Sequence, residues 1–292
     1  MTLRPQTIQI FLPGGEPTGI RVAEITTRIV QVIEVPRKLL PEFFKMAESE
    51  QVGVYYLVSK PDDDSQPEVY VGQTGDLRGR LAKHDSDKDF WERALVLISR
   101  TQSITQTHAL YLEWLSIQAA TKAQRYKPKN GNAGSRPYTP APMEADCLEI
   151  FETGQTLLTT LGYPLFDAVA PQVGQKDQAL EFFYCTSGGA NAKGIYTTEG
   201  FVVLEGSIGR KNNVPSIMGT SDAAFRDKLL ASDLVKIEGE SIVFLKDHLF
   251  PSPSRAAMAV LGRTANGWQE WKDSNGTTLD LLKRQAISSA SA

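Results

Sequence analysis

The sequence predicts an α+β protein, and three observations support this fold class. Runs rich in β-branched and aromatic residues alternate with amphipathic stretches. A stretch rich in Pro, Gly and Asn, residues 126–142, interrupts regular structure. A chain of 292 residues also exceeds one core of ordinary size. We expect a small antiparallel sheet flanked by helices over residues 49–172, with a trailing helix, an N-terminal β-rich extension over 1–48 and a C-terminal α+β accessory domain over 173–292.

The individual elements follow from local signals. Residues 6–34 alternate as short strands around a Pro/Gly turn, and 52–59 and 67–73 are two strands joined by the acidic turn "PDDDSQ". Asp76 is a predicted N-cap for a helix ending near His84. "TQTHALYLEWLSIQAA" gives the clearest helix. Beyond the expected boundary near residue 172, strands alternate with helices, one of them capped by Ser252 with Pro253 in its first position.

Composition limits the protein class. No apolar run approaches the roughly 20 residues of a membrane span, so we expect no membrane partner. The N-terminus lacks the apolar core of a secretory signal. The two cysteines, Cys147 and Cys185, are far apart in the sequence and outside metal-ligand spacing. These features favour a cytoplasmic location.

The net charge is −3, which argues against a whole surface that binds nucleic acid. A local basic run nevertheless follows the predicted central helix. It is either a solvated linker or a set of phosphate contacts, and its members are Lys122, Arg125, Lys127, Lys129 and Arg136.

Tyrosine and glycine recur in the predicted hairpin. Because strand side chains alternate between faces, Tyr55 shares a face with Gly53, and Tyr70 shares one with Gly72. A register that pairs Tyr55 with or near Tyr70 would place both hydroxyls on one side. The glycines are then expected to keep that side clear for a ligand.

Three charged or titratable residues extend this pattern. Arg80 and His84 lie one helical turn apart and therefore on one helix face. Glu113 has mostly apolar neighbours at helical spacing, where a carboxylate is costly unless a cation accompanies it. Taken singly, each residue of the pattern has a structural alternative: strand tyrosines pack, helix Arg and His residues are solvated, and Glu113 either extends to solvent or pairs with a lysine.

Taken together, "GVY" at 53–55, "YVG" at 70–72 and "QTGDLRGRLAKH" after them resemble the GIY-YIG nuclease family. Arg80, His84, a helix carrying Glu113 and an Asn-containing loop complete the resemblance, which covers about residues 50–135. The spacing between the two tyrosines is longer than usual, as a lengthened turn explains.

The resemblance implies a divalent-metal-dependent endonuclease that hydrolyses phosphodiester bonds in DNA. Glu113 would be the sole protein ligand of Mg²⁺ or Mn²⁺. Tyr55 would be the general base or part of a relay, and Arg80 would stabilise developing charge. Tyr70 and His84 would position phosphate or water. The family asparagine maps to Asn130, with Asn132 as the rival, although "NGN" is also a turn signal.

Residues 252–279 resemble a domain of unknown function found behind such nuclease cores and, more distantly, a restriction-associated domain proposed to read methylated adenine. Trp268 and Trp271 there either pack a small core or stack on a base. A DNA-selecting accessory domain would suit restriction or phage defence. Double-strand breaks would call for a homodimer. A catalytically silent nucleic-acid-binding module, a protein-interaction module and an RNA substrate remain alternatives.

Overall fold

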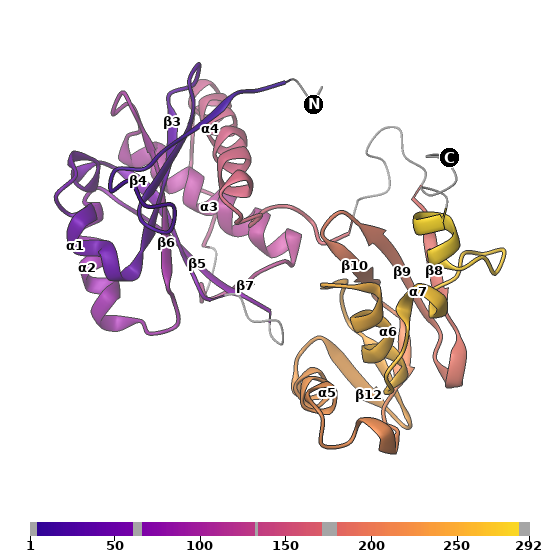
Figure 1. The fold of residues 1–292 in the computed structure, drawn as a ribbon. Coiled ribbons are helices and arrows are strands. Elements are labelled where there is room, and N and C mark those ends of the chain that lie inside the picture. The colour runs from indigo at the N-terminus through magenta and orange to yellow at the C-terminus, as the bar shows by residue number, and fades with distance from the viewer. Residues whose placement is uncertain (1–4, 61–65, 132–133, 171–179, 286–292) are drawn as a thin grey trace. The chain divides into compact units, whose positions relative to one another are not determined.

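A computed structural model describes residues 5–60, 66–131, 134–170 and 180–285 (Figure 1). The chain divides into two compact units, of which the first ends at Asp167 and the second begins at Ala168. Each unit combines strands with helices, so the predicted α+β class is confirmed. The boundary expected near residue 172 lies outside the described residues.

One seven-stranded sheet runs through the first unit in the order β1-β2-β3-β6-β4-β5-β7. Every neighbouring pair is antiparallel except β5 and β7. The strands are β1 (Ile8–Phe11), β2 (Arg21–Ile25), β3 (Val30–Pro36), β4 (Gly53–Val58), β5 (Glu68–Thr74), β6 (Arg93–Ser99) and β7 (Lys127–Pro128).

The N-terminal extension is part of this sheet. Strand β3 pairs with β6 along its whole length, from Val30 opposite Ser99 to Pro36 opposite Arg93. The three strands β1, β2 and β3 therefore do not form a separate β unit beside the nuclease-like region, because they continue its backbone hydrogen bonding.

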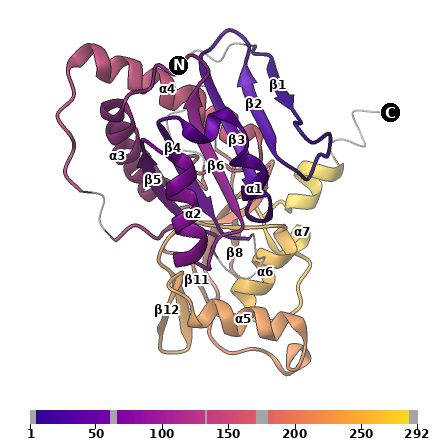
Figure 2. The same ribbon diagram turned by 90° about the vertical axis from the view of Figure 1, so that its left-hand side faces the viewer.

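Helices cover both faces of the sheet (Figure 2). On one face lie α3 (Gln106–Ala123) and α4 (Ala141–Thr160), which form a core with Tyr56 of β4. On the other lie α1 (Leu40–Phe43) and α2 (Leu77–Asp87), whose core includes Tyr55. Short 3₁₀ turns, η1 (Arg37–Leu39) and η2 (Ala47–Glu50), flank α1. Tyr55 and Tyr56 are neighbours in the sequence but belong to opposite layers, because strand side chains alternate.

Side-chain caps begin the helices near the candidate site. The Asp76 carboxylate accepts a hydrogen bond from the Gly79 amide at 3.0 Å, so the predicted cap of α2 is confirmed. Thr105 and His108 satisfy each other's backbone amides at the start of α3.

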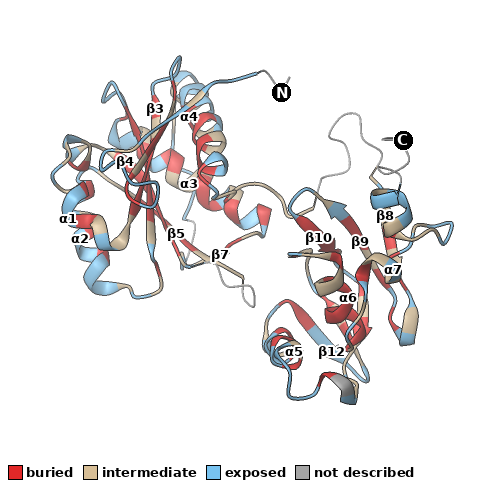
Figure 3. Ribbon diagram, in the orientation of Figure 1, coloured by how far each residue is buried: buried red, intermediate tan, exposed pale blue. Residues whose placement is uncertain are grey.

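The second unit has two small antiparallel sheets around a buried helix. Helix α6 (Pro253–Leu261) is buried along most of its length (Figure 3). Ser252 caps α6 and Pro253 is its first residue, as predicted. One sheet contains β8 (Phe182–Cys185), β9 (Ala192–Thr197), β10 (Gly200–Val203) and β14 (His248–Phe250), and the other contains β11 (Ile208–Arg210), β12 (Val235–Glu238) and β13 (Ser241–Phe244). The helices and helical turns are η3 (Ser187–Gly189), η4 (Pro215–Ile217), α5 (Ser221–Ala231), α6 (Pro253–Leu261), α7 (Gly267–Glu270) and a π-helical turn (Leu281–Gln285).

Among the described residues, no helix has both the length and the apolar character that crossing a membrane requires.

Candidate active site

The β4–β5 hairpin sets the positions of the two tyrosines. Tyr55 pairs with Gly72, and Leu57 pairs with Tyr70. Tyr55 and Tyr70 are therefore diagonal neighbours on one face, with ring centroids 6.4 Å apart. The expected shared face is present, although the register is shifted from a direct Tyr55–Tyr70 pair.

The hydroxyl of Tyr55 lies at the centre of a polar cluster. Its Oη is 2.8 Å from Nε2 of His84 and accepts a hydrogen bond of 3.1 Å from Nε of Arg80. Tyr55 is fully buried. Burial raises the pKa of its phenol above the usual value, although the hydrogen bond from Arg80 opposes this rise.

His84 is buried beneath the two tyrosines. Its ring centroid lies 5.5 Å from that of Tyr55 and 5.2 Å from that of Tyr70. Burial, followed by the charges of Arg80 and Lys88, lowers the pKa of His84 to about 4. His84 is therefore neutral at pH 7. Its second ring nitrogen, Nδ1, is buried and has no hydrogen-bond partner among the described residues.

Lys88 is a member of this cluster that the sequence interpretation missed. Lys88 is half-buried, and its Nζ lies 4.4 Å from the centroid of the Tyr70 ring. The available signal was helical spacing, because Arg80, His84 and Lys88 follow one another at intervals of one turn.

Glu113 is half-buried on α3. Burial raises the pKa of its carboxyl above the usual value, while a backbone hydrogen bond from Gln73 and the charge of Arg80 oppose that rise. The charge of Arg80 therefore acts on Glu113. The described residues contain no group of three or more His, Cys, Asp or Glu side chains suited to a metal ion.

A single incompletely compensated carboxylate is nevertheless compatible with Mg²⁺. This ion retains several waters and often uses one or two carboxylates together with substrate phosphate oxygens. The donor at Glu113 therefore fits a substrate-assisted Mg²⁺ or Mn²⁺ site.

The structure corrects the role expected for the two glycines. A Cβ at Gly72 would clash with the Tyr55 hydroxyl, and one at Gly53 would lie 2.8 Å from the Leu97 carbonyl oxygen. Both glycines make room for the protein's own atoms rather than for a ligand, namely the Tyr55 side chain beside Gly72 and the Leu97 backbone beside Gly53.

Asn130 contacts the backbone of the hairpin. Its Oδ1 accepts from the Val71 amide at 3.0 Å, and its Nδ2 donates to the Val71 carbonyl at 2.8 Å. The side chain thus extends the pairing of β5 and holds the loop after β7. This arrangement gives Asn130 a positioning role. The rival position, Asn132, lies outside the described residues.

The basic run is only partly available to a ligand. Arg125 donates to the Asp167 carbonyl, Lys129 pairs with Glu68 at 3.2 Å, and Arg136 pairs with Glu144 at 2.6 Å. Lys122 and Lys127 are exposed. Internal ion pairs thus use much of the charge that the sequence offered as a phosphate-binding surface.

The two candidate stacking tryptophans pack within the second unit. Trp271 is fully buried, its ring lies 4.3 Å from Phe201, and its indole donates to the Pro253 carbonyl at 3.0 Å. Trp268 is half-buried, with the Arg284 guanidinium 3.6 Å from its ring centroid. The structure therefore assigns Trp271 to the core and excludes it from base stacking.

Comparison with known proteins identifies one region of the chain. Residues 183–283 match a family model described as a domain of unknown function, DUF4357. The match lies within the second unit and agrees with the expected C-terminal domain of unknown function. No curated protein matches the chain significantly. No solved structure does so either.

Proposed function

We propose that this chain is a divalent-metal-dependent endonuclease of the GIY-YIG type that hydrolyses phosphodiester bonds in DNA. The observation that carries the proposal is the hydrogen-bonded position of the Tyr55 hydroxyl between Arg80 and His84. Glu113, a carboxylate suited to a metal ion, lies within electrostatic reach of both Tyr55 and Arg80.

Tyr55 and His84 form a proton relay in this proposal. Arg80 only donates, so the Tyr55 oxygen accepts from it and directs its own O–H towards Nε2 of the neutral His84. When water attacks the phosphorus, the Tyr55 oxygen takes a proton from that water and passes its original proton to His84. The incoming phosphate anion raises the pKa of His84, which favours this transfer.

Arg80, Tyr70 and Lys88 surround the position of the phosphate. The charge on Arg80 would stabilise the negative charge that develops on the phosphate oxygens during attack. The half-buried Tyr70 would orient the phosphate through its hydroxyl, and Lys88 would add a second cation beside the Tyr70 ring. The hydrogen bond from Arg80 to the Tyr55 hydroxyl holds the guanidinium before substrate arrives, which lowers the reorganisation that catalysis requires.

Glu113 would hold the metal ion. When bound there with substrate, Mg²⁺ or Mn²⁺ would stabilise negative charge on the leaving-group side of the phosphate. The Gln73 amide and Arg80 would keep the carboxylate ionised and oriented.

The second unit would select the DNA. Its separate core and its match to a C-terminal domain of unknown function support an accessory role. Two arginines of this unit are already paired within it, since Arg255 pairs with Asp222 and Arg263 pairs with Glu270. Adenine-methylated DNA tests whether this unit recognises a modified base.

The proposal is tested with purified full chain, supercoiled plasmid and Mg²⁺ or Mn²⁺. Tyr55→Phe should lower the nicking rate by about 100-fold or more, because the relay is lost. Tyr56→Phe is the matched control, since Tyr56 is also buried and its hydroxyl also has a side-chain partner, Ser116, but it lies on the opposite face. Its nicking rate should stay within about twofold, with a loss of about 1 kcal/mol of stability.

Other outcomes would select the alternatives. Salt-dependent DNA binding without cleavage would favour a catalytically silent binding module. Faster cleavage of a matched single-stranded RNA would change the substrate class. No binding of either nucleic acid would favour a protein-interaction module. Linear products at high protein concentration would indicate a homodimer. A different cleavage rate on adenine-methylated plasmid would indicate that the second unit selects the DNA.

A further inference from the structure

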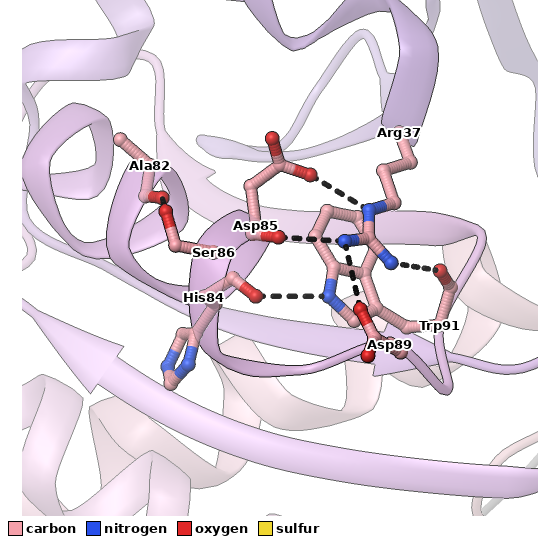
Figure 4. Close-up of polar contacts among 7 residues, drawn as sticks. All are labelled: Arg37, Ala82, His84, Asp85, Ser86, Asp89 and Trp91. Carbon is pink, nitrogen blue, oxygen red and sulfur yellow. Dashed lines mark hydrogen bonds and ion pairs between the residues drawn. The ribbon is translucent and has the colours of Figure 1, made fainter.

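Helix α2 carries Arg80 and His84. Arg37 lies in the N-terminal segment, which is the part of the chain before β4, and it ties the C-terminal end of α2 to that segment. Nε of Arg37 donates to the Asp85 carboxylate at 2.7 Å, and Nη2 donates to the Asp85 backbone carbonyl at 2.6 Å (Figure 4). The last four carbonyls of a helix lack partners within the helix. Arg37 therefore satisfies one of these carbonyls and places a cation at the negative end of the helix dipole.

Trp91 completes the link to His84. The Arg37 guanidinium lies 4.8 Å from the centroid of the Trp91 ring and donates to the Trp91 carbonyl at 3.3 Å. The indole Nε1 of Trp91 donates to the His84 carbonyl at 3.4 Å, and Trp91 itself is 1% exposed. Arg37 thus holds the last turn of α2 directly through Asp85 and indirectly through a buried indole.

We propose that Arg37 is a positioning residue for the active site, which fixes the last turn of α2 so that Nε2 of His84 stays within hydrogen-bond distance of Tyr55. The catalytic consequence rests on the proposed function. The structural consequence, a fixed position of His84 beside Tyr55, does not rest on the proposed function, because the Tyr55–His84 contact exists without substrate. This role lies with the N-terminal segment, outside the region that resembles the nuclease core.

A second arginine provides a matched control. Arg78, at the other end of α2, donates to the Phe44 carbonyl and lies 3.1 Å from the Glu50 carboxylate. It also ties α2 to the N-terminal segment, but at the turn farthest from His84. Arg37→Ala and Arg78→Ala therefore each remove one arginine tie, and only the former acts on the last turn.

The primary measurement is NMR titration of the imidazole signals in the full chain, which has three histidines. His84 faces Tyr55 and Tyr70 from the sheet, and Arg80, Lys83, Asp87 and Lys88 from its own helix and cap. In Arg37→Ala, the last turn should open to water, so the pKa of His84 should rise from about 4 towards its ordinary value of 6.5. In Arg78→Ala it should stay where it is.

A more conservative variant keeps the test valid if Arg37→Ala fails to fold. Trp91→Phe keeps the ring packing but removes the donor to the His84 carbonyl, and it should shift the His84 signals in the same direction to a smaller extent. The plasmid-nicking rate should fall by about 10- to 100-fold in Arg37→Ala with unchanged DNA affinity, and by less than about twofold in Arg78→Ala.

The outcomes separate the two proposals. A wild-type pKa and wild-type His84 signals in folded Arg37→Ala and Trp91→Phe would overturn the positioning role, whatever the activity. Shifted His84 signals in Arg37→Ala and Trp91→Phe, together with a wild type that never cleaves nucleic acid, would support the positioning role and reject the nuclease.

Discussion

The phenol oxygen of Tyr55 occupies the space beside Gly72 that a Cβ at position 72 would need. The two residues are direct cross-strand partners in the β4–β5 hairpin. The short side chain of glycine therefore lets the tyrosine hydroxyl lie over the neighbouring strand, where Arg80 and His84 reach it. This relationship makes the hairpin glycine a requirement for the position of the tyrosine.

Gly72→Ala should displace the Tyr55 hydroxyl from its two partners. We expect a loss of about 1–3 kcal/mol from overpacking and a fall in nicking rate of about 10- to 100-fold. Gly75→Ala is the control, because a Cβ there would meet only the flexible end of Gln106. Chemical denaturation and plasmid nicking measure the two effects. Wild-type nicking by Gly72→Ala would show that the Tyr55 hydroxyl does not need this space.

Glu113→Gln should abolish metal dependence and change how stability varies with pH. The folded-state pKa of Glu113 is raised, so the folded chain holds this proton longer than the unfolded chain does. Ionisation thus lowers wild-type stability as the pH rises from the unfolded towards the folded pKa, and Glu113→Gln removes that loss. We expect nicking to fall by about 100-fold or more.

Thermal unfolding with Mn²⁺ and a non-cleavable DNA provides an independent readout for Glu113. The melting temperature of the wild type should rise when Mn²⁺ is added to the DNA complex, and that of Glu113→Gln should not. Equal shifts in both proteins would place the metal ion elsewhere.

His84 should make the first unit less stable in mild acid. Its folded-state pKa of about 4 lies below the ordinary value of 6.5, so the unfolded chain takes up the proton first as the pH falls. The contribution to stability is full above about pH 6.5 and is lost progressively towards pH 4. Urea unfolding between pH 7.5 and 4.5 should show this slope in the wild type and a shallower one in His84→Gln. Identical slopes would contradict a buried neutral His84.

Arg226 should be the main polar support of the second unit. It is fully buried, and its guanidinium donates to the carbonyls of Arg210, Lys211, Met258 and Ala259. Two of these carbonyls belong to the C-terminal half of α6, which Arg226 therefore caps. Arg226→Met should destabilise this unit by about 3 kcal/mol, because several buried acceptors lose their donor.

Arg226→Lys distinguishes charge from geometry in this unit. A lysine keeps the charge but not the planar fork that reaches four carbonyls, so it should restore only part of the stability. Tryptophan fluorescence from Trp268 and Trp271 follows the unfolding. Full restoration by lysine would show that charge alone is sufficient.

Several features of the site were predictable because local backbone geometry fixes them. The period of two along a strand places Tyr55 and Tyr70 on one face, and the helical period places His84 one turn after Arg80. The caps at Asp76 and Ser252 also depend on residues only a few positions away. These predictions hold because neighbouring residues alone decide them.

Other features required the packing of distant segments. Sequence spacing suggested a gap for a ligand beside Gly53 and Gly72, but the register fills it with the Tyr55 hydroxyl and the Leu97 carbonyl. The sequence offered the basic run as a set of phosphate contacts, but the fold pairs two of its members with Glu68 and Glu144. The residues around Arg37 do not predict its contact with α2, because that contact joins segments 48 residues apart in the sequence.

The sequence by itself determined the α+β class, the faces of the two tyrosines and the helix that carries Arg80 and His84. Only the tertiary structure decided that the N-terminal strands join the central sheet, that Arg80 reaches the Tyr55 hydroxyl and that Arg37 holds the end of α2. The reason is physical. Side-chain direction repeats with the local backbone, whereas register and contacts between distant segments depend on which arrangement buries the whole core.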